Sequence, residues 1–167
     1  MKAIVAVDKK WGIGKNNGLL FQIAEDMRFF RQQTLGKTVV MGRKTLESFP
    51  NGKPLKNRKN VVLGNPKNLE GIVSVKNFDE LKTALSGENR NDVYVIGGGS
   101  VYNLLLPYCD SVLVTKVKAD GDAEVFFPNL DEDENFFVSS DSGDVATESG
   151  YTIRFVTYEN KNPKAWG

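Results

Sequence analysis

The segment that decides the fold is VYVIGGGSVY, residues 93–102, where a short apolar run meets three glycines and then a helical pattern. The run before Gly97 predicts a buried strand, and the pattern after Gly99 predicts a helix to about Leu106, ended by Pro107. Backbone N–H groups at such a turn bind phosphate, and glycine lets a ligand approach closely. A tight turn alone needs only one or two glycines, so the triplet favours a phosphate or dinucleotide site. It lacks the GxGxxG spacing of the usual dinucleotide fingerprint.

Outward from this segment, strands and helices alternate along the first two thirds of the chain. The pattern predicts strands at residues 3–7, 38–41, 60–63, 72–75, 92–96, 111–117, 136–139 and 151–158. It predicts helices at 23–34, 78–85 and 99–106, a turn or short helix at 42–45, and loops at 8–20, 49–54 and 118–133. Alternation implies parallel pairing, whereas the last two strands have no helix between them. We therefore expect a single α/β domain with a mixed, mainly parallel sheet and an antiparallel C-terminal edge.

Composition fits one globular domain, because the chain has 167 residues of which 40% are hydrophobic and 26% charged. The net charge of +1 creates no field that favours nucleic acid or an anionic membrane. No run approaches the ~20 apolar residues of a membrane span, and residues 1–14 lack the features of a signal peptide. The single cysteine, Cys109, excludes an intrachain disulfide framework. We expect a cytoplasmic protein with neither nucleic-acid nor membrane partners.

Histidine is absent from the chain, and this absence restricts the chemistry. It excludes a Ser-His-Asp or Cys-His nucleophile and a His-rich zinc site, and we expect no metal. Proton transfer must use a carboxylate, tyrosine, lysine or water. This favours a reaction carried mainly by a cofactor, which the protein binds and orients.

The segment AEDMRFF, residues 24–30, places an acid on the predicted inward face of a helix. Asp26 and Phe30 are four residues apart and share a face, with Met27 beside them. The helix dipole also favours acids in a first turn without any active site, an explanation that fits Glu25 better. A buried carboxylate without a nearby cation usually has a raised pKa and often a function. Asp26 is therefore the candidate catalytic acid.

Two pairs of basic residues adjoin predicted strands. MGRKT places Arg43 and Lys44 just after a strand's carboxyl end, where α/β sheets bind ligands and an arginine can bind a phosphate with two hydrogen bonds. A solvated basic turn explains this pair equally well from spacing alone. For Arg58 and Lys59 in PLKNRKNVVL, spacing alone favours the solvated turn.

Six segments in order, from about residue 3 to residue 158, resemble the bacterial dihydrofolate reductase family: WGIGKNNGLL, AEDMRFF, VVMGRKTLES, PLKNRKNVVL, VIGGGSVY and VFFP. The resemblance implies an eight-stranded mixed sheet flanked by four helices, with the domain at residues 1–160 and a C-terminal tail at 161–167. It implies an oxidoreductase that transfers a hydride from NADPH to 7,8-dihydrofolate, giving tetrahydrofolate for one-carbon, thymidylate and purine synthesis. Antifolates are the inhibitors that it implies, and we expect a monomer.

The resemblance also implies a substrate site. Asp26 corresponds to the carboxylate that binds the pterin 2-amino group and N3, and Arg58 to the arginine that pairs with the α-carboxylate of the glutamate tail. The position of Arg58 in the family thus overrides the interpretation from spacing. The implied substrate-binding residues are Ile4, Val5, Asp26, Met27, Phe30, Phe49, Leu55, Arg58, Ile96, Tyr102 and Thr115. Among them, the carbonyls of Ile4 and Ile96 line the pterin pocket, Phe30 packs on the ring, and Phe49 and Leu55 border the p-aminobenzoyl group.

On the cofactor side, the resemblance implies that the backbone of Ala6 and Ile13 binds the nicotinamide carboxamide. Residues 97–101 match the pyrophosphate loop, in which the family has a cis peptide between the first two glycines. The implied cofactor-binding residues are Ala6, Ile13, Gly14, Gly42, Arg43, Lys44, Thr45, Leu63, Gly64, Asn65, Lys76, Gly97, Gly98, Gly99, Ser100, Val101 and Tyr102. Arg43, Lys44 and Thr45 match the segment that holds the adenosine phosphates.

The chain departs from the family in and near a loop, residues 9–23, that resembles a mobile lid over the nicotinamide. Phe21 replaces a tryptophan whose N–H binds an ordered water, and Leu20 replaces the proline beside it. We include both with Asp26 among the catalytic candidates, with lid-admitted water delivering the proton to pterin N5. Ser100 replaces an arginine that faces phosphate, which leaves recognition of the 2′-phosphate to Arg43 and Lys44.

Two other functions stay open on the residues alone. A reductase of a pyrimidine intermediate or another pterin would not need Arg58, because its substrate lacks a glutamate tail. A nucleotide-binding regulatory module would not need a buried acid at Asp26.

Overall fold

Strands and helices alternate in the part of the chain that this computed structural model describes, residues 1–16 and 18–166. The strands are β1 (Lys2–Val7), β2 (Gly12–Gly14), β3 (Thr38–Gly42), β4 (Lys59–Leu63), β5 (Ile72–Val75), β6 (Val93–Gly97), β7 (Ser111–Val117), β8 (Val125–Phe126), β9 (Phe136–Asp141), β10 (Val145–Ala146) and β11 (Thr152–Asn160). The helices are α1 (Ala24–Thr34), α2 (Arg43–Ser48), α3 (Phe78–Ala84) and α4 (Gly99–Leu105). Asn17 of the predicted lid and Gly167 of the predicted tail lie outside the described residues.

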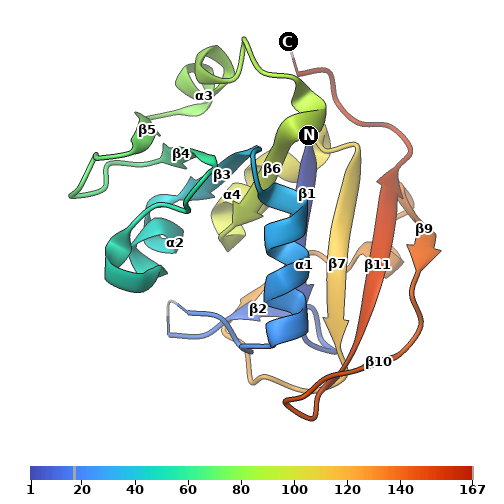
Figure 1. Cartoon of the computed structure of the whole chain (residues 1–167). Coiled ribbons are helices and arrows are strands. Elements are labelled where there is room, and N and C mark those ends of the chain that lie inside the picture. The colour runs from blue at the N-terminus through green and yellow to red at the C-terminus, as the bar shows by residue number, and fades with distance from the viewer. Residues whose placement is uncertain (17, 167) are drawn as a thin grey trace.

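The main sheet has the strand order β10-β11-β7-β1-β6-β3-β4-β5, and β9 also pairs with β11 (Figure 1). The neighbours from β7 through β1 to β5 are parallel, whereas β11 is antiparallel to β7, β9 and β10. This confirms the mixed sheet of eight strands along its main path, with an antiparallel C-terminal edge. The pattern missed β2 and β8, which pair with each other, and β10.

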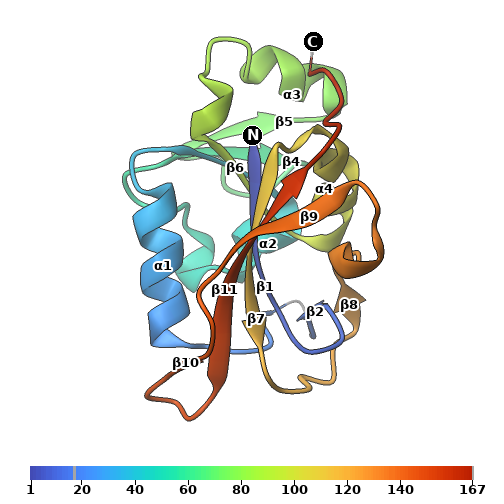
Figure 2. The same cartoon turned by 90° about the vertical axis from the view of Figure 1, so that its right-hand side faces the viewer.

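Side chains from the central strands form a core on each side of the sheet, because successive residues of a strand point to opposite faces. On one face, Val39, Met41 and Val62 pack together, and Phe30 of α1 and Leu46 of α2 lie against them. The other face has Val40, Val61 and Val95, with Leu81 of α3 and with Val101 and Leu105 of α4. Figure 2 shows α1 and α4 on opposite sides of the sheet. The valine-rich runs are therefore buried on both faces, as expected of parallel strands.

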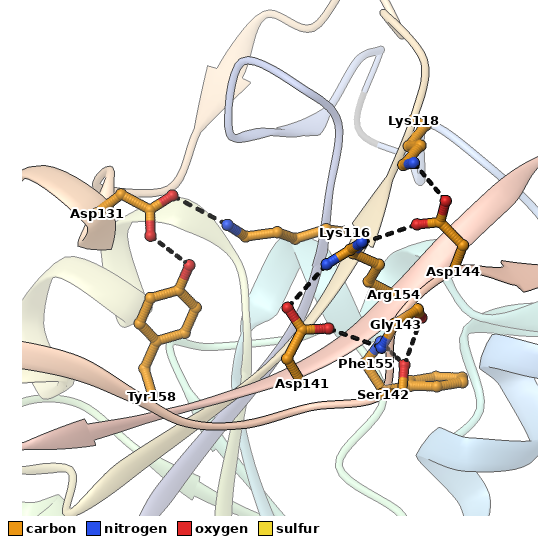
Figure 3. A network of polar contacts seen from close by, with 10 residues as sticks. All are labelled: Lys116, Lys118, Asp131, Asp141, Ser142, Gly143, Asp144, Arg154, Phe155 and Tyr158. Carbon is orange, nitrogen blue, oxygen red and sulfur yellow. Dashed lines mark hydrogen bonds and ion pairs between the residues drawn. The ribbon is translucent and has the colours of Figure 1, made fainter.

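A polar network fastens the antiparallel edge of the sheet (Figure 3). Arg154 of β11 donates to Asp141 at 2.9 Å and to Asp144 at 2.8 Å, and Lys118 donates to Asp144 at 2.6 Å. Asp131 accepts hydrogen bonds from Lys116 and from the Tyr158 hydroxyl. The ion pairs are partly exposed and each adds little stability alone, but together they tie β7, β11 and the segment between β9 and β10.

Candidate functional site

Asp26 lies near the start of α1, where the helix crosses the sheet opposite β7. Its Oδ1 accepts a hydrogen bond from the Thr115 hydroxyl at 2.6 Å, and Thr115 is buried in β7. Loss of solvation raises the pKa of Asp26 above its usual range, and the Thr115 hydrogen bond only partly opposes this. The described residues form no ion pair with Asp26. A carboxyl group in this setting holds a proton to higher pH than an exposed aspartate.

A small cavity of about 20 Å³ adjoins the Asp26 carboxyl group. It is lined by residues of β1, β7, α1 and the predicted lid: Ala6, Ile13, Leu19, Leu20, Phe21, Ile23, Asp26 and Val117. A cavity of this size holds about one water molecule. The fold thus brings the acid, both unusual lid residues and two residues expected on the nicotinamide side to one small space.

The residues beside Asp26 on its own helix do not all turn inward. Met27 is 57% exposed, so the expectation that it lies with Asp26 on the inward face of the helix is wrong. Phe30 does pack inward, in one apolar cluster with Ile4, Phe49, Leu55 and Ile96. Adjacent helix positions diverge by about 100°, so Met27 can point outward while Asp26 faces residues of β1, β7 and the lid.

Tyr102 of α4 is buried against β1. Its hydroxyl donates to the Ile4 carbonyl at 2.7 Å, and burial raises the pKa of this tyrosine. The Ile4 carbonyl retains one lone pair for another donor. The Val5 side chain packs in the core on the α4 side of the sheet, away from α1, so only its backbone is available to the cleft.

Arg58 lies beside the C-terminal end of α1. Its guanidinium donates to the Thr34 hydroxyl at 3.1 Å and to the Lys56 carbonyl at 2.9 Å. Loss of solvation lowers the pKa of Arg58, and the positive charge of Arg31 lowers it further. Arg58 is thus oriented by two hydrogen bonds with no acidic partner among the described residues, and a second cation is close to it.

The glycine turn after β6 lies next to the start of α2. The Gly97–Gly98 peptide is cis, which confirms the expectation, and Gly97 has a φ of 121°. A side chain at Gly98 would contact the Thr45 hydroxyl at 3.4 Å, and one at Gly99 would lie 2.8 Å from Val125. The turn therefore needs glycine for its conformation at Gly97 and for space at Gly99, and it lies between Thr45 of α2 and Val125 of β8.

Apart from Ile13 and Gly14, which lie in β2, the residues expected to bind the cofactor lie at or just after the carboxyl ends of five consecutive strands, β1, β6, β3, β4 and β5. Neighbouring strands are about 4.8 Å apart, so this edge spans roughly 19 Å. Arg43, Lys44, Asn65, Lys76 and Ser100 are exposed there. This length suits an extended dinucleotide laid across the sheet, with its charged end toward the exposed basic residues.

Arg43 forms an ion pair with Glu47, one turn further along α2, at 3.0 Å. It also borders a second hollow, about 360 Å³, with Glu47, Lys67 and Asn68. That hollow contains none of the residues around Asp26. We therefore place the chemistry at the smaller cavity, because only that cavity combines a perturbed acid with the lid.

The predicted lid is held by the loop that precedes β8. Glu124 donates its backbone N–H to the Gly14 carbonyl at 2.8 Å, and its carboxylate accepts from the Asn16 N–H at 2.8 Å. At the lid's far end, the Phe21 ring meets Tyr151 edge to face, with centroids 4.9 Å apart. The Phe21 side chain thus packs against Tyr151, and unlike an indole it has no N–H group to donate to a water in the cavity.

Sequence reasoning missed three groups at this site. Arg31 follows Phe30 directly in the helix pattern, and its neighbouring position could have revealed it. Asp8 and Glu124 lie in loops whose composition indicates only flexibility, and nothing in their spacing shows that they meet the lid.

Among the described residues, no three Cys, Asp or Glu side chains converge as metal ligands would.

Comparisons with known proteins agree on one family. The family described as dihydrofolate reductase matches residues 1–160. The dihydrofolate reductases of Bacillus subtilis and Schistosoma mansoni are 35% and 33% identical to the chain, over 98% and 95% of it and 96% and 95% of their own lengths. The solved structure of the Enterococcus faecalis enzyme, complexed with NADP(H) and RAB-propyl, superposes with a TM-score of 0.83 at 30% identity and covers 96% of each chain.

Proposed function

We propose, from the premise that the chain belongs to the dihydrofolate reductase family, that the cleft around Asp26 is the place where this enzyme binds and reduces its substrate. The chain uses NADPH to reduce 7,8-dihydrofolate to tetrahydrofolate. The observation that carries the assignment of the site is the Asp26 carboxyl group, desolvated and bonded to Thr115 beside a cavity for one water.

In this proposal the Asp26 carboxyl group binds the 2-amino group and N3 of the pterin ring. The carbonyls of Ile4 and Ile96 line the ring's edge, and Phe30 packs on its face. Phe49 and Leu55 border the p-aminobenzoyl group from the same apolar cluster. Arg58 pairs with the α-carboxylate of the glutamate tail, and Arg31 adds positive charge for the same anionic end.

The residues along the strand ends fit NADPH, because three glycines form the turn after β6 and the exposed basic side chains of Arg43, Lys44 and Lys76 lie toward β5. When bound, this cofactor supplies the hydride that reduces pterin C6. Ala6 and Ile13 hold the nicotinamide carboxamide, and residues 97–101 hold the pyrophosphate. Arg43, Lys44 and Thr45 hold the adenosine phosphates, with Arg43 leaving Glu47 for the 2′-phosphate.

The proton for pterin N5 comes from water in this proposal, because the Asp26 carboxyl group lies at the other edge of the ring. The cavity between Asp26 and the lid has room for one such molecule. Leu20 and Phe21 close this space and exclude bulk water. Asp26 polarises the ring, which makes N5 easier to protonate.

Further proposals concern the molecule as a whole. Residues 1–160 form the catalytic domain and residues 161–167 a tail, and the enzyme works as a monomer in the cytoplasm, without nucleic-acid or membrane partners. No helix in the described part of the chain has both the length and the apolar character of a membrane span. Antifolates that mimic the pterin compete for the Asp26 site.

An absorbance assay of NADPH oxidation with dihydrofolate tests the assignment of the site. Asp26→Ala should reduce kcat/KM by on the order of a hundredfold or more. Asp79→Ala, which removes an exposed acid from the first turn of α3, is the matched control and should keep the parent's rate. If both variants behaved like the parent, the reaction would take place elsewhere.

A further inference from the structure

We infer that Asp8 is a positioning residue whose buried carboxylate joins the lid to the loop facing it and so sets the lid over the cleft. The inference rests on the proposed lid role of residues 9–23. Asp8 lies directly after β1, outside the reacting cleft, and is only 2% exposed.

The Asp8 carboxylate binds two segments that are far apart in the sequence. Its Oδ1 accepts from the backbone N–H groups of Lys10 at 2.9 Å and Gly12 at 2.7 Å. Its Oδ2 accepts from the N–H of Gly121 at 3.0 Å. One oxygen thus holds the lid and the other holds the facing loop, 113 residues away.

The two segments are in van der Waals contact around this carboxylate. A side chain at Gly12 would come within 2.3 Å of the Ala123 Cβ and within 2.9 Å of both Asp8 oxygens. The described residues form no ion pair with Asp8. Three N–H groups therefore stabilise the buried charge, and separating the segments would leave one oxygen without its partner.

Backbone hydrogen bonds and ring contacts connect Asp8 to residues on the proposed cofactor side of the lid. The Asp8 N–H donates to the Gly12 carbonyl at 2.9 Å, and the Trp11 N–H donates to the Asp8 carbonyl at 3.0 Å. Trp11 packs on Phe127, whose ring meets that of Tyr102 at 5.0 Å. Ile13 and Gly14 come directly after Gly12 in the chain. The hydrogen bonds between Asp8 and Gly12 therefore determine where the part of the lid that faces the nicotinamide lies.

Asp8→Asn separates the two halves of the contact, because an amide has one acceptor oxygen. If the amide oxygen of Asn accepts from the N–H groups of Lys10 and Gly12, its NH₂ group faces the Gly121 N–H. Two donors then face each other and the hydrogen bond to Gly121 is lost. The variant should therefore slow single-turnover hydride transfer by on the order of tenfold, as expected for one lost charged hydrogen bond. The Kd of dihydrofolate, whose binding groups are untouched, should stay within about twofold. A merely structural role would lower the melting temperature and leave the rate per folded enzyme unchanged.

Lys10→Met is the matched control, because it removes the exposed 3.0 Å ion pair with Asp120 between the same two segments. It should leave the hydride-transfer rate within about twofold. Equal slowing of Lys10→Met and Asp8→Asn would overturn the specific role of Asp8, and so would an Asp8→Asn variant with the parent's rate.

Glu124→Gln separates this inference from the lid proposal on which it rests, because Glu124 holds the other end of the same lid segment. If Glu124→Gln slows hydride transfer and Asp8→Asn does not, the positioning role of Asp8 is wrong but the lid role of residues 9–23 is supported. If neither variant slows hydride transfer, both proposals are wrong. Should Asp8→Asn not fold, amide exchange in the parent decides: the Gly121 N–H should exchange about a hundredfold or more slower than in an unfolded chain. Exchange at the unfolded rate would contradict the inference.

Discussion

Asp26 and Thr115 form a hydrogen-bonded pair at the centre of the proposed site. Burial makes the carboxyl group hold its proton, and the Thr115 hydroxyl opposes this by stabilising the ionised form. The net effect is a pKa of Asp26 above that of an exposed aspartate. If Asp26 binds the pterin as we propose, the Thr115 hydroxyl influences the protonation state in which it does so.

Removing the Thr115 hydroxyl should raise the pKa of Asp26 further. In Thr115→Val, the falling limb of the kcat/KM profile for dihydrofolate should move to higher pH, because the protonated arrangement persists longer. Thr115→Ser keeps the hydroxyl and should keep the parent's profile. A Val variant whose limb stays in place would show that Thr115 does not tune the acid.

Arg58 should discriminate ligands by their tails. Arg58→Ala should weaken methotrexate binding by roughly 1.5–3 kcal/mol, the value of a charged hydrogen bond, and affect trimethoprim much less. Titration of both inhibitors measures the difference, with Arg28→Ala on the exposed side of α1 as control. A similar loss for the two ligands would mean that Arg58 acts only through its contacts with Thr34 and Lys56.

Among the elements, α2 is the one to which our proposal assigns the choice between NADPH and NADH. Arg43 is paired with Glu47 in this structure and must exchange that partner for the 2′-phosphate. NADPH should be preferred over NADH, and Arg43→Ala should reduce the ratio of their kcat/KM values by on the order of tenfold or more. Glu47→Gln, which removes the competing partner, should preserve or increase this ratio. Equal efficiency of both cofactors in the parent enzyme would refute the assignment.

The central strands and α1 could be predicted from the sequence because their residues alternate or repeat over several turns. β2 and β8 could not, since strands of three and two residues carry no period and contain glycine or exposed side chains. The same limit applies to the site. Asp26 was found from its helix face, whereas the exposed Met27 shows that this face was drawn too wide. Asp8 and Glu124 depend on contacts between loops more than a hundred residues apart, which no local pattern records.

Across the whole molecule, the C-terminal tail closes over the region of α3. The Trp166 ring meets the rings of Phe78 and Tyr108 edge to face, with its centroid 5.4 and 5.5 Å from theirs. None of these three residues lines the cavity beside Asp26. Trp166→Ala should therefore lower stability by about 1 kcal/mol, or about 2–4 °C in melting temperature, and leave kcat unchanged. Calorimetry and the absorbance assay check the two halves of this expectation. A loss of kcat without a loss of stability would contradict it.

Burial of the Asp26 carboxyl group also makes the free energy of unfolding depend on pH. Because the folded pKa of Asp26 is raised, its contribution to stability is fully present below the unfolded pKa of about 3.9 and is lost as pH rises through the folded value. Asp26→Asn has no such loss and should melt at a higher temperature than the parent above that value. Near pH 4 the two should converge. Melting curves across pH test this, and a variant less stable than the parent at neutral pH would contradict it.

Single-turnover hydride transfer from NADPH to dihydrofolate, measured across pH for the parent and Asp26→Asn, tests the central claim most directly. In the parent, the rate should fall as pH rises through the raised pKa of Asp26, because the protonated arrangement is the productive one. Asp26→Asn should be slower by on the order of a hundredfold or more and lose this pH dependence, with NADPH affinity little changed. If Asp26→Asn kept the parent's rate and pH profile, Asp26 would be only a structural residue of α1, and the catalytic assignment would be wrong.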